Sequence, residues 1–128
     1  MTARDIMTKE VITVGPATPV KELARILTRH RISGVLVENR GKVLGVVSEG
    51  DLIAKKGKQV KDIMSKKIIG VAEETPVEEI AALMTTHKIK RLPVFREKEL
   101  VGIVSRADIV RAIAMGKHVA LHTPVYDL

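Results

Sequence analysis

The positions of apolar residues along the chain predict two amphipathic helices. Apolar residues recur at helical spacing between residues 20 and 27 and again between residues 77 and 84. The pairs Thr18-Pro19 and Thr75-Pro76 precede these stretches, so we expect threonine at each N-cap and proline at each first helical position. The first helix should end near residues 29–30.

Short β-rich runs surround the two helices. One run, Val11–Val14, precedes the first helix. Two further pairs of runs predict hairpins, Val35–Glu38 with Lys42–Val47 around Asn39-Arg40-Gly41, and Leu92–Phe95 with Leu100–Val104 around residues 96–99. Closing helices should begin near Glu49 and Arg106. The order strand, helix, two strands, helix therefore occurs twice and places the chain in the α+β class.

The order of elements recurs because the sequence itself is repeated. A shift of 57 positions aligns residues 5–53 with residues 62–110 without a gap, and about 19 of these 49 positions are identical. A unit of this size cannot easily enclose a core alone, so we expect two copies, related by an approximate twofold axis, with two equivalent clefts. We predict repeat 1 over residues 1–57, repeat 2 over 58–116, a linker at Gly57–Lys61, and a C-terminal extension over 117–128.

Composition narrows the classes of protein that the sequence permits. The 128 residues include no Cys, no Trp, one Tyr and one Phe, and 45% are hydrophobic, so the core must be aliphatic and thiolate metal sites are excluded. No stretch has the pattern of a signal peptide or a membrane span, and we expect a cytoplasmic protein that does not act on membranes. Abundant Lys and Glu with a single Asn and a single Gln is typical of thermophilic proteins.

The formal charge of +7 favours anionic partners. Nucleotide phosphates and nucleic acid both fit this charge, so a nucleic-acid-associated basic protein is an alternative function. The near absence of aromatic residues argues against the stacking platforms of proteins that bind single strands.

A hydroxyl residue followed three positions later by an acid recurs in GVVSEGD and GIVSRAD. A predicted strand ends at Ser48 or Ser105, and Asp51 or Asp108 falls in the first turn of the next helix. One interpretation is a helix cap. The other is a ligand site, where free N–H groups hold an anion and the carboxylate accepts hydrogen bonds from both hydroxyls of a ribose. Recurrence of the whole pattern favours the ligand site.

Over residues 5–114 the chain resembles a tandem pair of cystathionine-β-synthase (CBS) domains. The resemblance rests on DIM(S/T), TPV before an amphipathic helix, RLPV in the second copy, and G-hydrophobic-V-S-x-x-D, in this order. It implies two β-α-β-β-α repeats packed through their sheets, as in stand-alone prokaryotic pairs. It also implies a sensor of energy or metabolite state that binds AMP, ADP, ATP or S-adenosylmethionine, forms a homodimer through its helices and signals to a regulated protein.

In that family each cleft takes its Ser and Asp from one repeat and its strand residues from the other. The resemblance therefore implies cleft A, formed by Ser48, Asp51, Ile69, Lys90, Arg91 and Pro93, and cleft B, formed by Ile12, Ser33, Gly34, Leu36, Ser105, Arg106 and Asp108. Lys90 and Arg91 align with neutral Ser33 and Gly34, so we expect phosphates to favour cleft A. Leu36 stands where the family usually has the proline that Pro93 represents.

Other candidate sites are weaker. His30 and His87 recur at predicted helix ends, where a cation near the C-terminus is sufficient explanation. His118 and His122 lack a third ligand for a metal. Ser48 and Ser105 lack a histidine base, and no phosphate-binding glycine motif occurs. We expect no catalytic residue, no metal and no cofactor, with an adenine nucleotide as a regulatory ligand.

Overall fold

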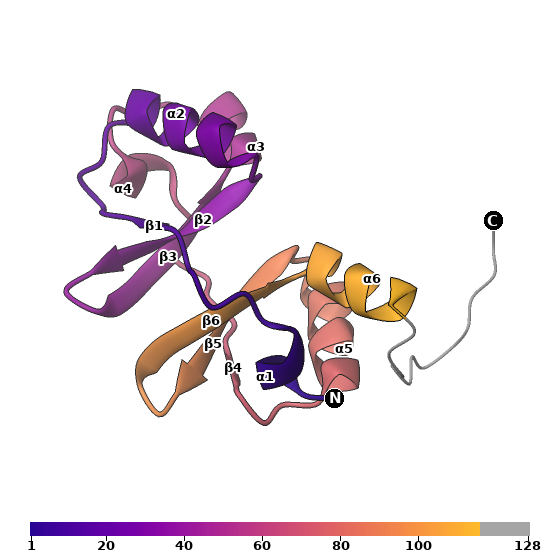
Figure 1. Ribbon diagram of the computed structural model, residues 1–128. Helices are drawn as coiled ribbons and strands as arrows, with labels where there is room; N and C mark the ends of the chain where they lie inside the picture. The colour runs from indigo at the N-terminus through magenta and orange to yellow at the C-terminus, as the bar shows by residue number, and fades with distance from the viewer. Residues whose placement is uncertain (116–128) are drawn as a thin grey trace. The chain divides into compact units, whose positions relative to one another are not determined.

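The computed structural model describes residues 1–115, which divide into two compact units of mixed α and β structure (Figure 1). Unit 2 comprises Ile12–Ile68, and unit 1 combines residues 1–11 with the chain from Ile69 onward. The C-terminal extension expected at residues 117–128, with His118 and His122, lies outside the described residues.

Each unit contains a three-stranded sheet and three helices. Unit 2 has strands β1 (Thr13–Val14), β2 (Gly34–Asn39) and β3 (Lys42–Ser48) and helices α2 (Val20–His30), α3 (Glu49–Ala54) and α4 (Val60–Ile63). Unit 1 has β4 (Val71–Ala72), β5 (Arg91–Arg96) and β6 (Glu99–Ser105), and α1 (Ala3–Ile6), α5 (Val77–His87) and α6 (Arg106–Ala114). The first strand of each sheet runs parallel to the second, and the third pairs antiparallel with the second. The α+β class, both amphipathic helices, both hairpins and both closing helices are confirmed.

Each unit includes the leading segment of the other repeat: residues 1–11 of repeat 1 lie in unit 1, and residues 58–68 of repeat 2 lie in unit 2. In unit 1 the backbone N–H of Ala3 donates to the carbonyl of Thr75 at 2.9 Å, and Figure 1 shows α1 beside α5. In unit 2 the N–H of Val60, which is 57 residues further on, donates to the carbonyl of Thr18 at 2.8 Å. The two repeats therefore exchange equivalent segments through equivalent backbone hydrogen bonds.

The predicted caps of the two long helices are wrong by one residue. Pro19 and Pro76 are the N-cap residues rather than the first helical residues, and their backbones are extended, with ψ of 141° and 144°. The exchanged segment explains the difference, because the carbonyl of Lys58 accepts a hydrogen bond from the N–H of Val20 at 3.0 Å. A backbone carbonyl thus satisfies a first-turn donor at the start of α2, and α5 has the equivalent bond.

The single-turn helices α1 and α4 were not predicted. Each begins with a capping box, between Thr2 and Asp5 in α1 and between Gln59 and Asp62 in α4. The predicted linker Gly57–Lys61 is therefore too long, because its last two residues belong to α4 and Val60 is fully buried. Both boxes repeat the spacing of Ser48 and Asp51, so the sequence carried the signal for these helices.

Each unit has its own aliphatic core. In unit 1 residues of α5, β5 and β6 pack with Ala3, and in unit 2 residues of α2, β2 and β3 pack with Val60 and Ile63. The exchanged segments therefore contribute buried side chains to both cores.

Candidate ligand-binding site

Asp51 turns back on Ser48 at the junction of β3 and α3. Its Oδ2 accepts hydrogen bonds from the backbone N–H and the hydroxyl of Ser48 at 2.9 and 3.2 Å. Its Oδ1 pairs with Nζ of Lys55 at 2.8 Å, and the carboxylate side chain is 17% exposed. The cap interpretation is confirmed here, and the acid still reaches solvent.

Asp108 makes the same arrangement with Ser105 at the junction of β6 and α6. Its Oδ2 accepts from the backbone N–H and the hydroxyl of Ser105 at 2.8 and 3.1 Å. Its Oδ1 accepts from Nη1 of Arg111 at 2.9 Å and from the hydroxyl of Thr8 at 3.4 Å. Asp108 is buried. Both hydrogen bonds of the capping box at the start of α6 are present.

In unit 1, residues predicted for cleft A lie beside residues predicted for cleft B. Arg91 stands opposite Ser105 in the ladder between β5 and β6. The backbone N–H of Arg106 donates to the carbonyl of Lys90 at 3.0 Å, and both of these cationic residues are exposed. The start of α6 thus has two exposed cationic residues next to its hydroxyl and its acid.

The equivalent position in unit 2 lacks this positive charge. Gly34 stands opposite Ser48, and the backbone N–H of Glu49 donates to the carbonyl of Ser33 at 2.9 Å. The backbone geometry matches that of unit 1, but Ser33 and Gly34 are neutral. The two units therefore differ in charge at the same strand end.

The apolar candidates occupy equivalent places in the two units. Leu36 in β2 and Pro93 in β5 are buried, and Ile12 and Ile69 precede β1 and β4 and are half-buried. Each predicted cleft takes its hydroxyl and acid from one unit and its strand residues from the other. The pairing of these halves into clefts A and B stays a prediction.

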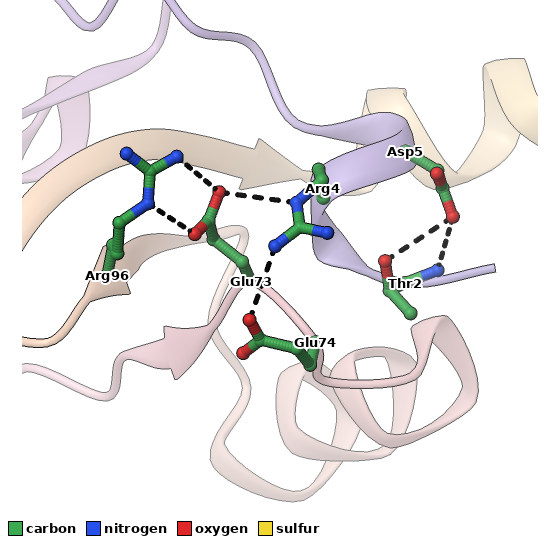
Figure 2. A network of polar contacts seen from close by, with 6 residues as sticks. All are labelled: Thr2, Arg4, Asp5, Glu73, Glu74 and Arg96. Atoms are coloured by element: carbon green, nitrogen blue, oxygen red, sulfur yellow. Dashed lines mark hydrogen bonds and ion pairs between the residues drawn. The ribbon is translucent and has the colours of Figure 1, made fainter.

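A charged cluster that the sequence analysis missed surrounds Glu73 in unit 1 (Figure 2). Arg96 binds the carboxylate of Glu73 through Nε at 2.8 Å and Nη2 at 3.1 Å. Arg4 reaches the same carboxylate through Nε at 3.4 Å and reaches Glu74 through Nη2 at 3.3 Å. The side chain of Glu73 is only 3% exposed, so a buried carboxylate joins the leading segment to β5.

The arginines keep Glu73 ionised. Hydrogen bonds from Arg96 lower the pKa of Glu73 from 4.5 to about 2, and they outweigh the effect of burial, which raises it. The first repeat has Pro16 in place of Glu73 and Asn39 in place of Arg96. These two coupled differences between otherwise similar repeats were the signal for the cluster.

An open groove of about 530 Å³ lies between α5 and α6 in unit 1. Its apolar residues come from both helices, and its cationic residues are Lys88, Lys90 and Arg106. Val110 and Ile113 line the groove and are 63% and 44% exposed. The groove therefore combines exposed apolar surface with positive charge.

Residues 1–115 contain neither a cluster of possible metal ligands nor a membrane-spanning helix. No group of three or more possible ligands among these residues could hold a metal ion. None of the described helices combines the length and apolar character that crossing a membrane requires. His30 is the last residue of α2 and His87 is the last residue of α5, which confirms their predicted positions at helix ends.

Comparisons with known proteins identify related chains. The sequence pattern of the CBS domain matches residues 3–57 and 60–115. Inosine-5'-monophosphate dehydrogenase from Methanocaldococcus jannaschii is 34% identical over 113 residues, which are 85% of this chain and 23% of that protein. The chain thus spans about a quarter of the length of that relative.

Two solved structures share the fold and hold adenosine-containing molecules. The CBS domain pair of protein MJ0100, in complex with 5′-methylthioadenosine and S-adenosyl-L-methionine, is 30% identical with a TM-score of 0.84, over 91% of this chain and 98% of that chain. CBSX2 in complex with AMP is 31% identical with a TM-score of 0.83, over the same shares of the two chains, 91% and 98%.

Proposed function

This chain belongs to the CBS domain family, whose tandem pairs are regulatory rather than catalytic modules, and on that premise we propose that it binds an adenosine-containing ligand and signals its occupancy to a partner protein. One observation carries the proposal: a serine and a buried or half-buried aspartate recur at the same strand-to-helix junction in both units. The ligands of the two solved relatives, AMP, 5′-methylthioadenosine and S-adenosyl-L-methionine, share the adenosine group.

The two aspartates are the proposed ribose ligands. An ionised carboxylate accepts hydrogen bonds from the 2′ and 3′ hydroxyls of a ribose, and such charge-assisted bonds are strong. Asp51 and Asp108 are each fixed by a capping box, so their carboxylates are held in one orientation before a ligand arrives. This order reduces the entropy that binding would otherwise cost.

The remaining candidates would hold the base and the phosphates. The apolar side chains of Ile12 and Leu36, or of Ile69 and Pro93, offer a dry surface for adenine. Lys90 and Arg91 are the proposed phosphate ligands of cleft A, and Arg106 is the candidate for cleft B. Because each cleft would use residues from both repeats, a bound ligand would favour one arrangement of the repeats, and a partner that prefers this arrangement would detect it.

We also propose a homodimer that covers the groove between α5 and α6. The support is the exposed apolar surface of Val110, Ile113 and Met115 on and just after α6, which is 63%, 44% and 67% exposed. Sedimentation at micromolar concentration should show a dimer, and Val110→Lys should shift it toward the 14.0 kDa monomer. Only a monomer in the unsubstituted protein would overturn this part of the proposal.

Calorimetric titration with adenosine, AMP, ADP, ATP and S-adenosylmethionine tests the proposed function. Asp51→Ala and Asp108→Ala should each weaken binding at one site by roughly tenfold or more, because a hydrogen bond to a charged group contributes about 1.5–3 kcal/mol. Asp5→Ala is a matched control, because Asp5 also closes a capping box but is not a proposed ligand. Unchanged titrations in both site variants would overturn the assignment.

A further inference from the structure

The carboxylate of Asp108 accepts four hydrogen bonds from its own chain. Ser105 donates two of them to Oδ2, from its backbone N–H at 2.8 Å and its hydroxyl at 3.1 Å. Arg111 and Thr8 donate the other two to Oδ1, at 2.9 and 3.4 Å. A carboxylate has about four acceptor positions, so every position of Asp108 is in use.

The two oxygens differ in how easily they can exchange partners. The bonds to Oδ2 belong to the capping box that starts α6, and breaking them would leave a helix terminus unsatisfied. The partners of Oδ1 come from exposed residues, since the side chain of Arg111 is 62% exposed and Thr8 is also exposed. Water can satisfy both groups after they leave, so Oδ1 is the oxygen that can accept a new donor.

Asp51 in unit 2 has fewer partners on its corresponding oxygen. Its Oδ1 pairs with Lys55 at 2.8 Å, and within the described residues no second donor reaches that oxygen. Thr8 corresponds to Ser65, whose hydroxyl instead accepts the N–H of Lys67 at 3.3 Å. Arg111 corresponds to Ala54, which has no donor side chain. The Arg111 contact is therefore absent from unit 2 because of a substitution, whereas Ser65 keeps a hydroxyl that is hydrogen-bonded elsewhere.

We propose that Thr8 and Arg111 are built-in competitors for the ligand of Asp108. This inference rests on the proposed function, in which Asp108 receives ribose hydroxyls. A ribose must displace Thr8 and Arg111 from Oδ1 before both of its hydroxyls can bind. The Asp108 site therefore binds adenosine more weakly than it would without these two contacts. By thermodynamic reciprocity, the ligand also weakens the contact between the N-terminal segment and α6.

Adenosine titrations in an Asp51→Ala background test the proposal, because binding is then confined to Asp108. Adenosine lacks phosphates, so the loss of charge at position 111 does not affect a phosphate contact. Thr8→Val removes the hydroxyl, keeps the side-chain shape and keeps the backbone pairing with Ile103, and should tighten adenosine binding about two- to tenfold. Arg111→Met should tighten it by about tenfold.

Two control variants separate competition from a change in folding. Thr8→Ser retains the hydroxyl and should leave the affinity for adenosine unchanged. Ser65→Ala, tested in an Asp108→Ala background, should leave the affinity of the Asp51 site unchanged. Urea unfolding of each variant gives its stability, and a loss of stability alone does not tighten a binding site.

The outcomes distinguish this inference from the proposed function. Tighter binding in Thr8→Val and Arg111→Met supports the inference, including the case in which adenosine binds measurably only after these substitutions. Binding that both variants leave unchanged or weaken overturns the inference and leaves the proposed function standing. Failure of the unsubstituted protein to bind any adenosine-containing ligand overturns the proposed function and the inference with it.

Discussion

Arg96 holds Glu73 with two parallel hydrogen bonds, from Nε at 2.8 Å and Nη2 at 3.1 Å. A carboxylate that is 3% exposed is stable only if such partners replace the water it has lost. Arg4 adds a third contact at 3.4 Å from the leading segment of repeat 1, residues 1–11. The cluster therefore ties together three parts of unit 1 that are distant in sequence: the leading segment, the turn before α5, and β5.

Acid should destabilise this cluster within a defined pH range. The pKa of Glu73 is about 2 in the folded protein and 4.5 as its ordinary value, so the unfolded state binds more protons between these pH values. The contribution of Glu73 to the free energy of unfolding is complete above pH 4.5 and is lost as the pH falls toward 2. Glu73→Gln should therefore lower stability near neutral pH and remove this part of the pH dependence, as measured by urea unfolding from pH 2 to 7.

Glu74→Gln is the matched control for that experiment. Glu74 also pairs with Arg4, but its side chain is 72% exposed, and exposed ion pairs contribute little to stability. Its substitution should leave both the stability and its pH dependence nearly unchanged. Equal effects of Glu73→Gln and Glu74→Gln would show that burial of Glu73 has no energetic role.

Two equivalent glycines should tolerate alanine differently. A Cβ on Gly45 would overlap the backbone carbonyl oxygen of Ser65, whereas a Cβ on Gly102 would meet the flexible side chain of Met7, with Sδ at 2.5 Å and Cγ at 2.9 Å. The backbone of Ser65 is hydrogen-bonded to Val46 and cannot move aside without losing these bonds. The side chain of Met7 can instead change its rotamer.

Gly45→Ala should therefore reduce the free energy of unfolding by about 1–3 kcal/mol, and Gly102→Ala should reduce it by less. Urea unfolding of the two variants at one pH measures both losses. A larger loss in Gly102→Ala than in Gly45→Ala would contradict the prediction.

The sequence predicted the two long helices, both hairpins and both closing helices because their signals are local. Each signal lies within a window of a few residues. The signals are the helical spacing of apolar residues, the turn at Arg40 and Gly41 with φ of 51° and 79°, and Ser-x-x-Asp at the starts of α3 and α6. The same logic applies to the site, where the repeated Ser-x-x-Asp was found from spacing alone.

The exchange of leading segments and the Glu73 cluster could not be found in this way. The apolar residues of the DIM motif at residues 5–7 and 62–64 predict that the leading segments are buried. They do not indicate which repeat each segment packs against. Glu73 lies in a polar turn, where acids are usually solvated, and its burial depends on Arg4 and Arg96, which are 69 and 23 positions away. Such partners follow from the tertiary fold and not from local pattern.

Replacement of a left-handed residue at a helix end should stabilise unit 2. Arg31 follows α2 with φ of 53° and ψ of 47°, a conformation that glycine adopts without steric cost. Arg31→Gly should raise the free energy of unfolding by about 0.5–1 kcal/mol, whereas Arg29→Gly, inside the last turn, should lower it by about 1 kcal/mol. Chemical unfolding of both variants checks the two signs, and a loss of stability in Arg31→Gly would contradict the first.

The positive charge at Lys90 and Arg91 should separate phosphate-bearing ligands from adenosine. Lys90→Ala combined with Arg91→Ala should weaken ATP and ADP by about tenfold or more and adenosine far less, because only the phosphates lose charge-assisted partners. Equal losses for ATP and adenosine would instead assign these residues to the fold or to the adenine pocket.

The same double variant identifies the cleft to which the two cations belong. In the crossed arrangement they serve the site of Asp51, so the loss of ATP affinity should appear when Asp108→Ala leaves only that site. Within unit 1, however, Arg91 stands opposite Ser105, and the carbonyl of Lys90 accepts the N–H of Arg106. If the cations served this neighbouring serine, the loss would appear in the Asp51→Ala background instead. Titrations with ATP in both backgrounds therefore decide whether each site takes its charge from its own repeat or from the other.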